Sequence, residues 1–214
     1  MRPTLPALAL LWAATGAAQS VISAKAALVH YAEGQVFVSH RPREQKFQMF
    51  PQMRERDLLG TESGRAEVLL NPNVFLRLDQ ASSLRVLSER ITDPSVELLH
   101  GRFVLEVVEV HRDEPVTLTC GKATIAILKP GIYRIDAQPA VVRVFGGKAL
   151  VEGEGRRMTV AKGEALPLDG TWLKHKFDRA RGDDFDLWSR HRSRLLLLSA
   201  AAQHPLEIGD HQLQ

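Results

Sequence analysis

The chain has 214 residues, and its 28 Lys and Arg against 25 Asp and Glu give a formal net charge of only +3. This weak, interspersed positive charge argues against a nucleic-acid-binding protein, in which basic residues would cluster on one face. A hydrophobic content of 44% is enough for a packed core, so we expect the chain to fold. The single cysteine, Cys120, excludes an intramolecular disulfide, and its phase with Val116 and Leu118 favours a buried position.

Residues 1–18 have the three-part pattern of a secretory signal peptide. Met1 and Arg2 supply the positive start, Leu5 to Ala14 is apolar, and small residues follow at 16–18. The apolar run is shorter than the roughly 20 residues that a bilayer-spanning helix needs. We therefore expect an exported protein, periplasmic or associated with the cell envelope, with no transmembrane segment after signal cleavage.

Between residues 57 and 168, short apolar runs alternate with turn residues, and helical spacing never persists. The stretch from Asp57 to Leu87 predicts a β-meander, with Ala66, Val68 and Leu70 on one face of its first strand. Further strand-length runs lie at 96–99, 101–107, 116–120, 123–128, 132–136, 141–145, 148–152 and 157–160. The expected fold is all-β, a two-layer β-sandwich or flattened β-roll of short antiparallel strands, followed by one C-terminal α-helix.

A weak internal repeat accompanies these strands. A glycine, a polar residue and an apolar run occur in this order at Gly34, Gly101, Gly121, Gly147 and, in a shorter form, Gly163. Such glycines suit tight corners with positive φ. The uneven spacing fits both a repetitive β-roll and an ordinary sandwich with glycine turns, and the sequence leaves the two open.

The character of the chain changes after residue 170. Residues 171–182 are basic and resemble a linker, and Asp183, Asp184 and Asp186 lie where acidic residues favour a helix start. Apolar residues then recur at helical spacing as far as about residue 203, shortly before Pro205. The predicted organisation is a signal peptide (1–18), an all-β domain (19–170), a basic linker with an amphipathic helix (171–203) and a flexible tail (204–214).

Several stretches within residues 28–168 together resemble the FecR-like family of exported bacterial domains. They are Asp57–Thr61, Gly64–Val68, Val74–Leu78, Ser82–Leu84, Val96–Arg102, Gly131–Asp136 and Val141–Gly147. The resemblance implies a periplasmic all-β domain, which in the best-known members receives a signal from an outer-membrane receptor and passes it to a sigma factor. This chain differs, because a signal peptide replaces the cytoplasmic anti-sigma segment and the transmembrane helix, and Leu128–Gly131 replaces a common Arg-Gly-Thr turn. The resemblance therefore implies a stand-alone binding or scaffold domain.

The sequence predicts no catalytic, cofactor or metal site, and hence a protein that is not an enzyme. The eight histidines show no metal-ligand spacing, and no serine has the setting of a nucleophile elbow. Glu106 with Glu109, and Asp113 with Glu114, are the only carboxylate pairs worth weighing for acid–base chemistry. We interpret all four side chains as solvated surface.

The sequence suggests contacts for an envelope protein or a polysaccharide, in a binding or scaffold role connected with signal sensing. Candidate contact residues are Phe75 on an outward strand position and Trp188, Arg190 and Arg194 on the C-terminal helix. That helix either covers the end of the β domain, or docks a partner or an anionic membrane. A homo-oligomer is also open. Two other functions compete: a β-jellyroll-like carrier of a lipid or other apolar ligand, and a cell-wall glycan hydrolase.

Overall fold

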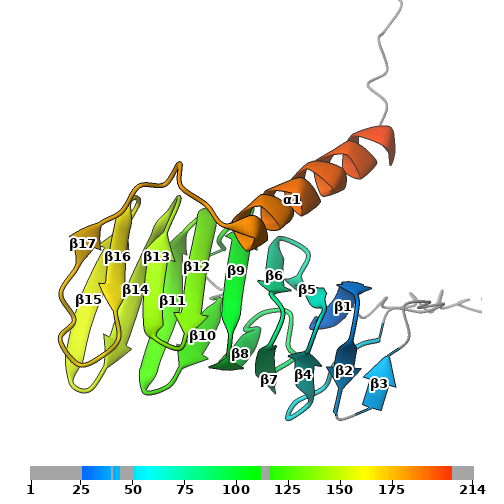
Figure 1. Ribbon diagram of the computed structural model, residues 1–214, viewed down its shortest axis with the longest axis horizontal. Coiled ribbons are helices and arrows are strands. Elements are labelled where there is room, and N and C mark those ends of the chain that lie inside the picture. Colours follow the sequence, from blue (N-terminus) through cyan, green and yellow to red (C-terminus); the bar gives the residue numbers. More distant parts are fainter. Residues whose placement is uncertain (1–25, 40, 44–50, 112–115, 204–214) are drawn as a thin grey trace, which may run out of the picture.

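The computed structural model describes residues 26–39, 41–43, 51–111 and 116–203, which form two stacked β-sheets and one helix (Figure 1). The expected all-β sandwich with a C-terminal helix is confirmed. The predicted signal peptide and the predicted tail lie outside the described residues.

The first sheet has eight strands. In spatial order they are β1 (Leu28–Glu33), β5 (Arg65–Asn71), β6 (Val74–Leu78), β9 (Arg102–Val107), β12 (Gly131–Ala137), β13 (Ala140–Val144), β16 (Glu164–Pro167) and β17 (His175–Lys176).

The second sheet has nine strands. In spatial order they are β15 (Arg156–Ala161), β14 (Lys148–Gly153), β11 (Ala123–Lys129), β10 (Thr117–Cys120), β8 (Ser95–His100), β7 (Ser82–Ser88), β4 (Leu58–Thr61), β2 (Val36–Val38) and β3 (Arg41–Arg43).

The chain moves from one end of the sandwich to the other as it alternates between the sheets. The hairpin β5–β6 lies in the first sheet, β7–β8 in the second, and later strand pairs continue this alternation. In Figure 1 the colours accordingly run from blue at one end of both sheets to yellow at the other. Each passage of the chain thus adds a strand or a hairpin to alternate sheets.

Three sequence expectations need correction. The meander predicted for residues 57–87 is wrong, because β7 leaves the β5–β6 hairpin and pairs with β4 in the other sheet. Residues 58–61, at the start of this stretch, form the strand β4. The strands are not all antiparallel, since β8 and β10 pair in parallel. Within the expected linker, His175 and Lys176 form the short edge strand β17.

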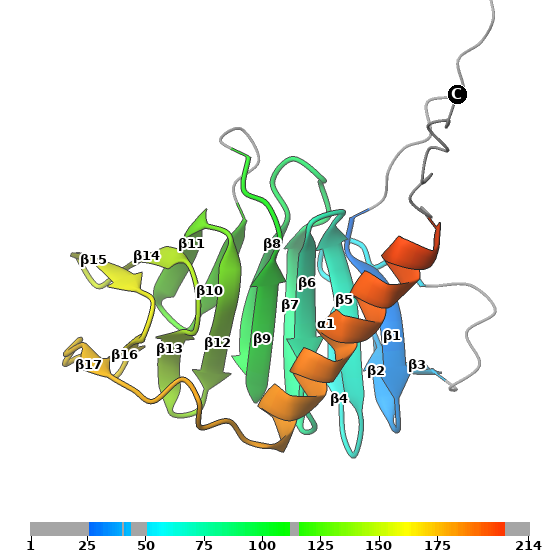
Figure 2. The ribbon, with the colours of Figure 1, turned by 90° about the horizontal axis from the view of Figure 1, so that it is seen from above.

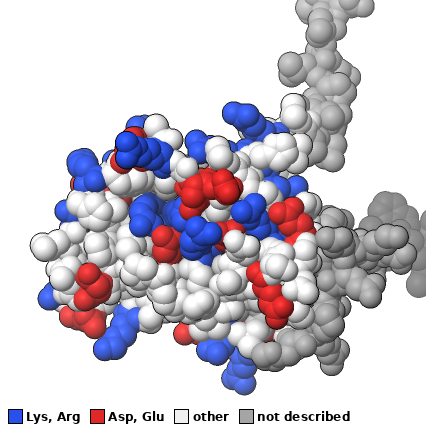
Figure 3. Space-filling view, in the orientation of Figure 1, with Lys and Arg blue, Asp and Glu red and all other residues white. Residues whose placement is uncertain are grey.

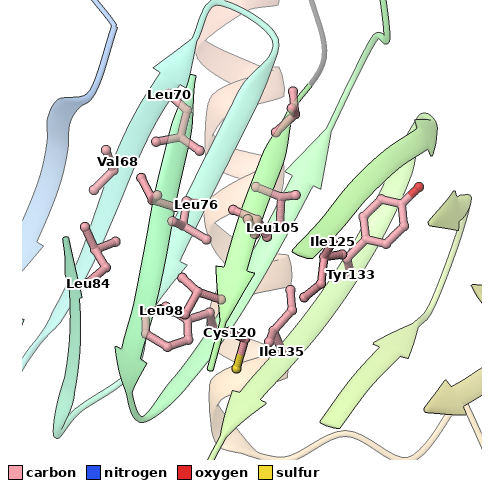
Figure 4. Close-up of a cluster of buried hydrophobic side chains, with 14 of the residues drawn as sticks. Val68, Leu70, Leu76, Leu84, Leu98, Leu105, Cys120, Ile125, Tyr133 and Ile135 are labelled. Carbon is pink, nitrogen blue, oxygen red and sulfur yellow. The ribbon is translucent and has the colours of Figure 1, made fainter. Parts of the chain in front are cut away.

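Alternating residues from both sheets fill the space between them. Leu76 and Leu105 lie directly opposite each other on β6 and β9, and both are fully buried. Figure 4 shows such side chains from both sheets meeting in one cluster with Cys120. Cys120 is only 3% exposed, which confirms the buried position expected for this residue, and burial raises the pKa of its thiol to about 11.

The repeated glycines occupy the tight corners that the sequence predicts. All five have positive φ, at 66° for Gly34, 92° for Gly101, 58° for Gly121, 95° for Gly147 and 81° for Gly163. At Gly101, between β8 and β9, a side chain would also collide with Ser82. This corner therefore requires glycine for both its φ angle and its close packing.

The helix α1 (Asp184–Gln203) lies across the outer face of the first sheet (Figure 2). Its extent agrees with the predicted end near residue 203. It does not cover the open end of the sandwich; instead it runs from β9 back over β6 and β5 towards β1. This position shields one outer face, and within the described residues no helix covers the outer face of the second sheet.

We expect Leu105→Ala to lower the free energy of unfolding by about 2–5 kcal/mol, because the substitution leaves a cavity in a packed core. Leu173→Ala is the control, since Leu173 is 72% exposed and its truncation should change stability by less than about 0.5 kcal/mol. Urea unfolding followed by circular dichroism measures both. Similar losses in the two variants would contradict this description of the core.

A polar helix interface and an open groove as candidate functional sites

Charged side chains lie on the outer face of the first sheet, beneath α1. Glu67 on β5 and Arg77 on β6 are directly opposite in register, and both are essentially inaccessible to solvent. Arg77 Nε lies 2.8 Å from one carboxylate oxygen of Glu67, and its Nη1 lies 2.7 Å from a carboxylate oxygen of Glu106 on β9. A buried guanidinium thus links two carboxylates on its neighbouring strands.

The helix completes this network with polar side chains. Arg77 Nη1 donates to Ser189 Oγ at 2.9 Å and to Ser193 Oγ at 3.2 Å, and Ser193 in turn donates to Glu106. Arg192 donates to Glu67 at 2.8 Å. Beyond its first turn, the described sheet-facing side of α1 is therefore mostly polar. The helix is held there by hydrogen bonds and ion pairs more than by an apolar stripe.

The pKa of Glu67 depends on two opposing effects, the burial of its carboxylate and the basic side chains around it. Burial by itself would raise that pKa, but the hydrogen bonds from His30 and Arg192 and the positive charge of Arg77 lower it to about 2. Nδ1 of His30 lies 2.9 Å from Glu67 Oε1. The carboxylate is thus ionised although it is buried, because three basic side chains surround it.

The N-terminus of α1 is fixed by a second ionic cluster. Asp183 and Asp186 accept hydrogen bonds from each other's backbone N–H, at 3.0 and 3.1 Å, as in a capping box. Arg134 on β12 donates to both carboxylates at 2.8 Å. Burial raises the pKa of Asp186, whereas the hydrogen bond from Arg134 overcomes burial and lowers the pKa of Asp183. Arg134 thereby joins the helix start to the middle of the sheet.

Aromatic packing adds an apolar anchor to the first turn. The fully buried Phe185 ring stacks on Trp188 with 5.9 Å between centroids, and the guanidinium of Arg65 lies 5.4 Å from the Trp188 ring. Farther along, Arg192 lies 3.9 Å from the ring centroid of Tyr31 on β1. The cation–π contacts extend the anchoring from β5 to β1.

The four predicted contact residues fall into two groups. Trp188 is half-buried in the helix interface, and Phe75 is half-buried on β6 with its ring 6.3 Å from that of His30. Arg190 and Arg194 are exposed on α1. Phe75 and Trp188 thus pack against other residues of this chain, whereas the two arginines are exposed. A partner contact at any of the four residues stays a prediction.

Glu106 is not the solvated carboxylate that its strand phase predicts. It is partly buried because α1 covers this outward face, and it pairs with Arg77 and Ser193. Glu109 is exposed, 3.5 Å from His111, and Asp113 and Glu114 lie outside the described residues. The sequence did contain a signal for the network, since the β5–β6 hairpin places Glu67 opposite Arg77, but nothing in the strand pattern indicated a covering helix.

The uncovered outer face of the second sheet contains a groove of about 550 Å³. Strand register places Phe37, Gly60, Ser83 and His100 in one row across β2, β4, β7 and β8. The two small residues at the centre of the row leave a depression between larger ones, and a Cβ added at Gly60 would meet no atom within 4 Å. Sequence reasoning missed this site, because only strand register shows that the small residues are neighbours.

The groove combines an apolar lining with polar groups. Phe37, Leu58 and Leu99 supply apolar surface, while Glu62, Ser83 and His100 bring polar side chains to the same depression. Within the described part of the chain these three polar side chains make no hydrogen bond or ion pair with another residue. They are therefore available to a ligand.

Comparison with known proteins identifies the family. The family described as FecR protein matches residues 57–165, about half of the chain. The chain belongs to the FecR family. The match runs from the start of β4 into β16, so β1, β2, β3, β17 and α1 lie outside the matched residues of this FecR protein.

Two crystal structures of a protein from Parabacteroides distasonis ATCC 8503, provisionally described as an anti-sigma factor, are similar to this FecR protein. One has a TM-score of 0.49 and 17% identity, and the other a TM-score of 0.48 and 19% identity. The alignments cover 57% and 56% of this chain and 60% and 59% of those chains, so this chain spans less than two thirds of their length. No curated protein matches the chain.

Charge and hydropathy bear on the surroundings of this FecR protein. On the face shown in Figure 3, basic and acidic side chains are intermixed and form no extended basic surface. Within the described ranges, no helix combines the length and the apolar character needed to cross a membrane.

We expect Arg77→Met to lower the free energy of unfolding by roughly 3–5 kcal/mol, because it leaves the buried carboxylate of Glu67 and the partly buried carboxylate of Glu106 without their central cation. Arg85→Met is the matched control, since Arg85 pairs with Glu97 at 2.8 Å on an exposed part of the second sheet. That change should cost less than about 1 kcal/mol. Equal effects in urea unfolding would show that the interface contributes no more than a surface pair.

The lowered pKa of Glu67 predicts a loss of stability in acid. The unfolded carboxyl, with a pKa near 4.5, binds a proton at a higher pH than the folded one at about 2, so protonation favours unfolding. Stability should be complete above about pH 5 and fall as the pH is lowered from there to about 2. Glu67→Gln should flatten this part of a stability profile, whereas Glu97→Gln should leave it in place; an unchanged slope in Glu67→Gln would contradict the assignment.

Proposed function

We propose that this FecR protein is an exported, non-enzymatic binding module that recognises a polysaccharide of the cell envelope in the groove of its second sheet. The observation that carries the proposal is the groove around Gly60, which lies on the outer face that α1 leaves open. Its volume of about 550 Å³ is within the range of roughly 300–1,000 Å³ found for small-ligand sites.

The chemistry of the groove supports a sugar. A pyranose ring has an apolar C–H face and hydroxyl groups around its edge. Phe37, Leu58 and Leu99 can contact such a face, while Glu62, Ser83 and His100 can exchange hydrogen bonds with the hydroxyls. The groove is open rather than enclosed, so a long polysaccharide strand could pass over it with one or two units seated.

Two competing functions have less support. An internal carrier for a lipid needs space between the sheets, but side chains of both sheets meet in the described interior, and the large groove lies outside it. A glycan hydrolase needs two carboxylates placed about the scissile bond. Glu106 is instead held by Arg77 and Ser193 beneath α1, and Glu62 is the only carboxylate among the described residues that line the groove.

A polysaccharide bound in the groove would be the signal that this FecR protein senses. Membership of the FecR family makes a regulatory role a reasonable setting for a binding module. An envelope protein that inserts an apolar side chain into the groove is the second candidate partner, favoured by the same apolar lining of Phe37, Leu58 and Leu99.

Gly60→Leu provides the test, because a leucine side chain would fill the groove without a clash at its Cβ. We expect binding of soluble envelope glycans, with chitotetraose included among them, to weaken by about tenfold or more in isothermal titration. Thr124→Leu adds the same side chain to an exposed site of β11, away from the groove, and should bind like the unaltered chain. Both variants should keep the thermal stability of the parent.

Two outcomes would contradict the proposal. If the unaltered chain binds none of the glycans tested, the proposal that the groove binds a polysaccharide is wrong. If a photo-crosslinker placed at Phe37 captures one envelope protein, and Gly60→Leu abolishes that capture, the groove is a protein-binding site.

A further inference from the structure

The exposed side of α1 carries a ridge in which two arginines lie between two leucines. We define this α1 ridge as Leu187, Arg190, Arg194 and Leu198, which are spaced three, four and four residues apart and so share one face of the helix. Leu187 is 57% exposed and Leu198 67% exposed, and both arginines are exposed. The ridge is about 16 Å long, since eleven residues separate its ends.

The fold makes little use of this ridge. Side chains that hold α1 on the sheet, including Phe185, Ser189 and Arg192, lie on the opposite side of the helix. Within the ridge, Arg190 donates a hydrogen bond of 3.3 Å only to the backbone of its own helix, at Asp186. Exposed leucines and arginines at these positions therefore need an explanation other than packing.

The charge of this part of the helix has one sign. From residue 187 to residue 203 the sequence has Arg190, Arg192 and Arg194 together with His191, and it has no Asp or Glu. Arg192 is neutralised by Glu67 in the interface. Arg194 and Arg190 are both exposed, although the guanidinium of Arg190 also lies beside Gly182 at the edge of the helix–sheet contact. The exposed face thus presents positive charge flanked by apolar side chains.

We propose that the α1 ridge binds the surface of an anionic phospholipid membrane. Arginines at a membrane surface pair with lipid phosphates, and leucines beside them enter the boundary between headgroups and acyl chains. A second copy of this chain fits less well, because two ridges would bring like charges together. A ridge that protrudes from a sheet also suits a flat surface, which can reach all four side chains at once.

This proposal does not depend on the polysaccharide. The helix α1 lies outside the first sheet (Figure 1), whereas the residues that line the groove belong to the second sheet, so the two surfaces face opposite directions. A chain that rests on a membrane through α1 would turn its groove away from the lipid. Its two surfaces could then engage a membrane and a separate ligand simultaneously.

Co-sedimentation with vesicles tests the ridge. The full chain should bind vesicles of phosphatidylglycerol mixed with phosphatidylcholine at low salt, bind them less at high salt, and not bind phosphatidylcholine alone. Arg190→Glu combined with Arg194→Glu should weaken this binding by about tenfold or more. Arg90→Glu with Lys122→Glu is the matched control, because it changes the net charge equally at two exposed sites away from α1.

The leucines are tested separately. Leu187→Gln combined with Leu198→Gln should also weaken vesicle binding, whereas Leu128→Gln with Leu173→Gln, at exposed leucines elsewhere, should not. A polarity-sensitive fluorophore on Leu198→Cys should shift to the blue when anionic vesicles are added. The label is specific because Cys120 is buried.

Every variant carries the same N-terminal residues, so the apolar run at 5–14 contributes equally and differences report on α1. The proposal is overturned if the two charge-reversal variants lose binding equally, since binding would then follow net charge alone. It is also overturned if the ridge variants bind as the parent does, or if the fluorophore at position 198 responds to an acidic protein and not to vesicles.

Discussion

The buried guanidinium of Arg77 is the interaction on which the arrangement of this molecule depends. It lies between Glu67 and Glu106 on its neighbouring strands and also donates to two serines of α1. A buried charge is costly unless it is fully paired, so the sheet and the helix need each other: without α1, these side chains face water, and without the ion pairs, α1 has little apolar surface to hold it. The difference between the closed face and the open face of the sandwich follows from this one cluster.

An interface of this kind selects one helix position. Apolar stripes tolerate sliding, because one leucine replaces another at similar cost, whereas the hydrogen bonds from Arg77, Arg134 and Arg192 require partners at fixed places along α1. The capping pair Asp183 and Asp186 fixes the start of the helix in the same way. The outer face of the helix, which bears Arg190 and Arg194, is consequently held at a fixed angle to the sheet.

The sequence predicted which residues form strands and the helix better than it predicted which strands lie side by side. Period-two alternation located most strands, glycine corners were correct, and the helix was predicted to end near residue 203. Strand exchange between the sheets was not predicted, because β5, β6 and β7 have the same alternation whether or not they share a sheet. Glu106 was interpreted as a surface residue for a related reason: alternation shows which side of a sheet a residue faces, but not what covers that side. The groove at Gly60 depends on which strands are adjacent, and local patterns do not contain that information.

The steady advance of the chain along the sandwich has a consequence for how the molecule is assembled. The first sheet grows in sequence order from β1 to β17, and the second grows in sequence order from β2 to β15, with β3 added at its early edge. Each new hairpin therefore finds an existing edge to extend. Such growth resembles that of repeat proteins, in which contacts between successive units dominate and length can change by whole units. The helix runs against this direction: it starts near the late strand β12, through Arg134, and returns to the early strands β5 and β1 through Glu67 and Tyr31. The helix therefore connects the early strands to a late strand. It can dock along its full length only on a sandwich whose intervening hairpins are already in place.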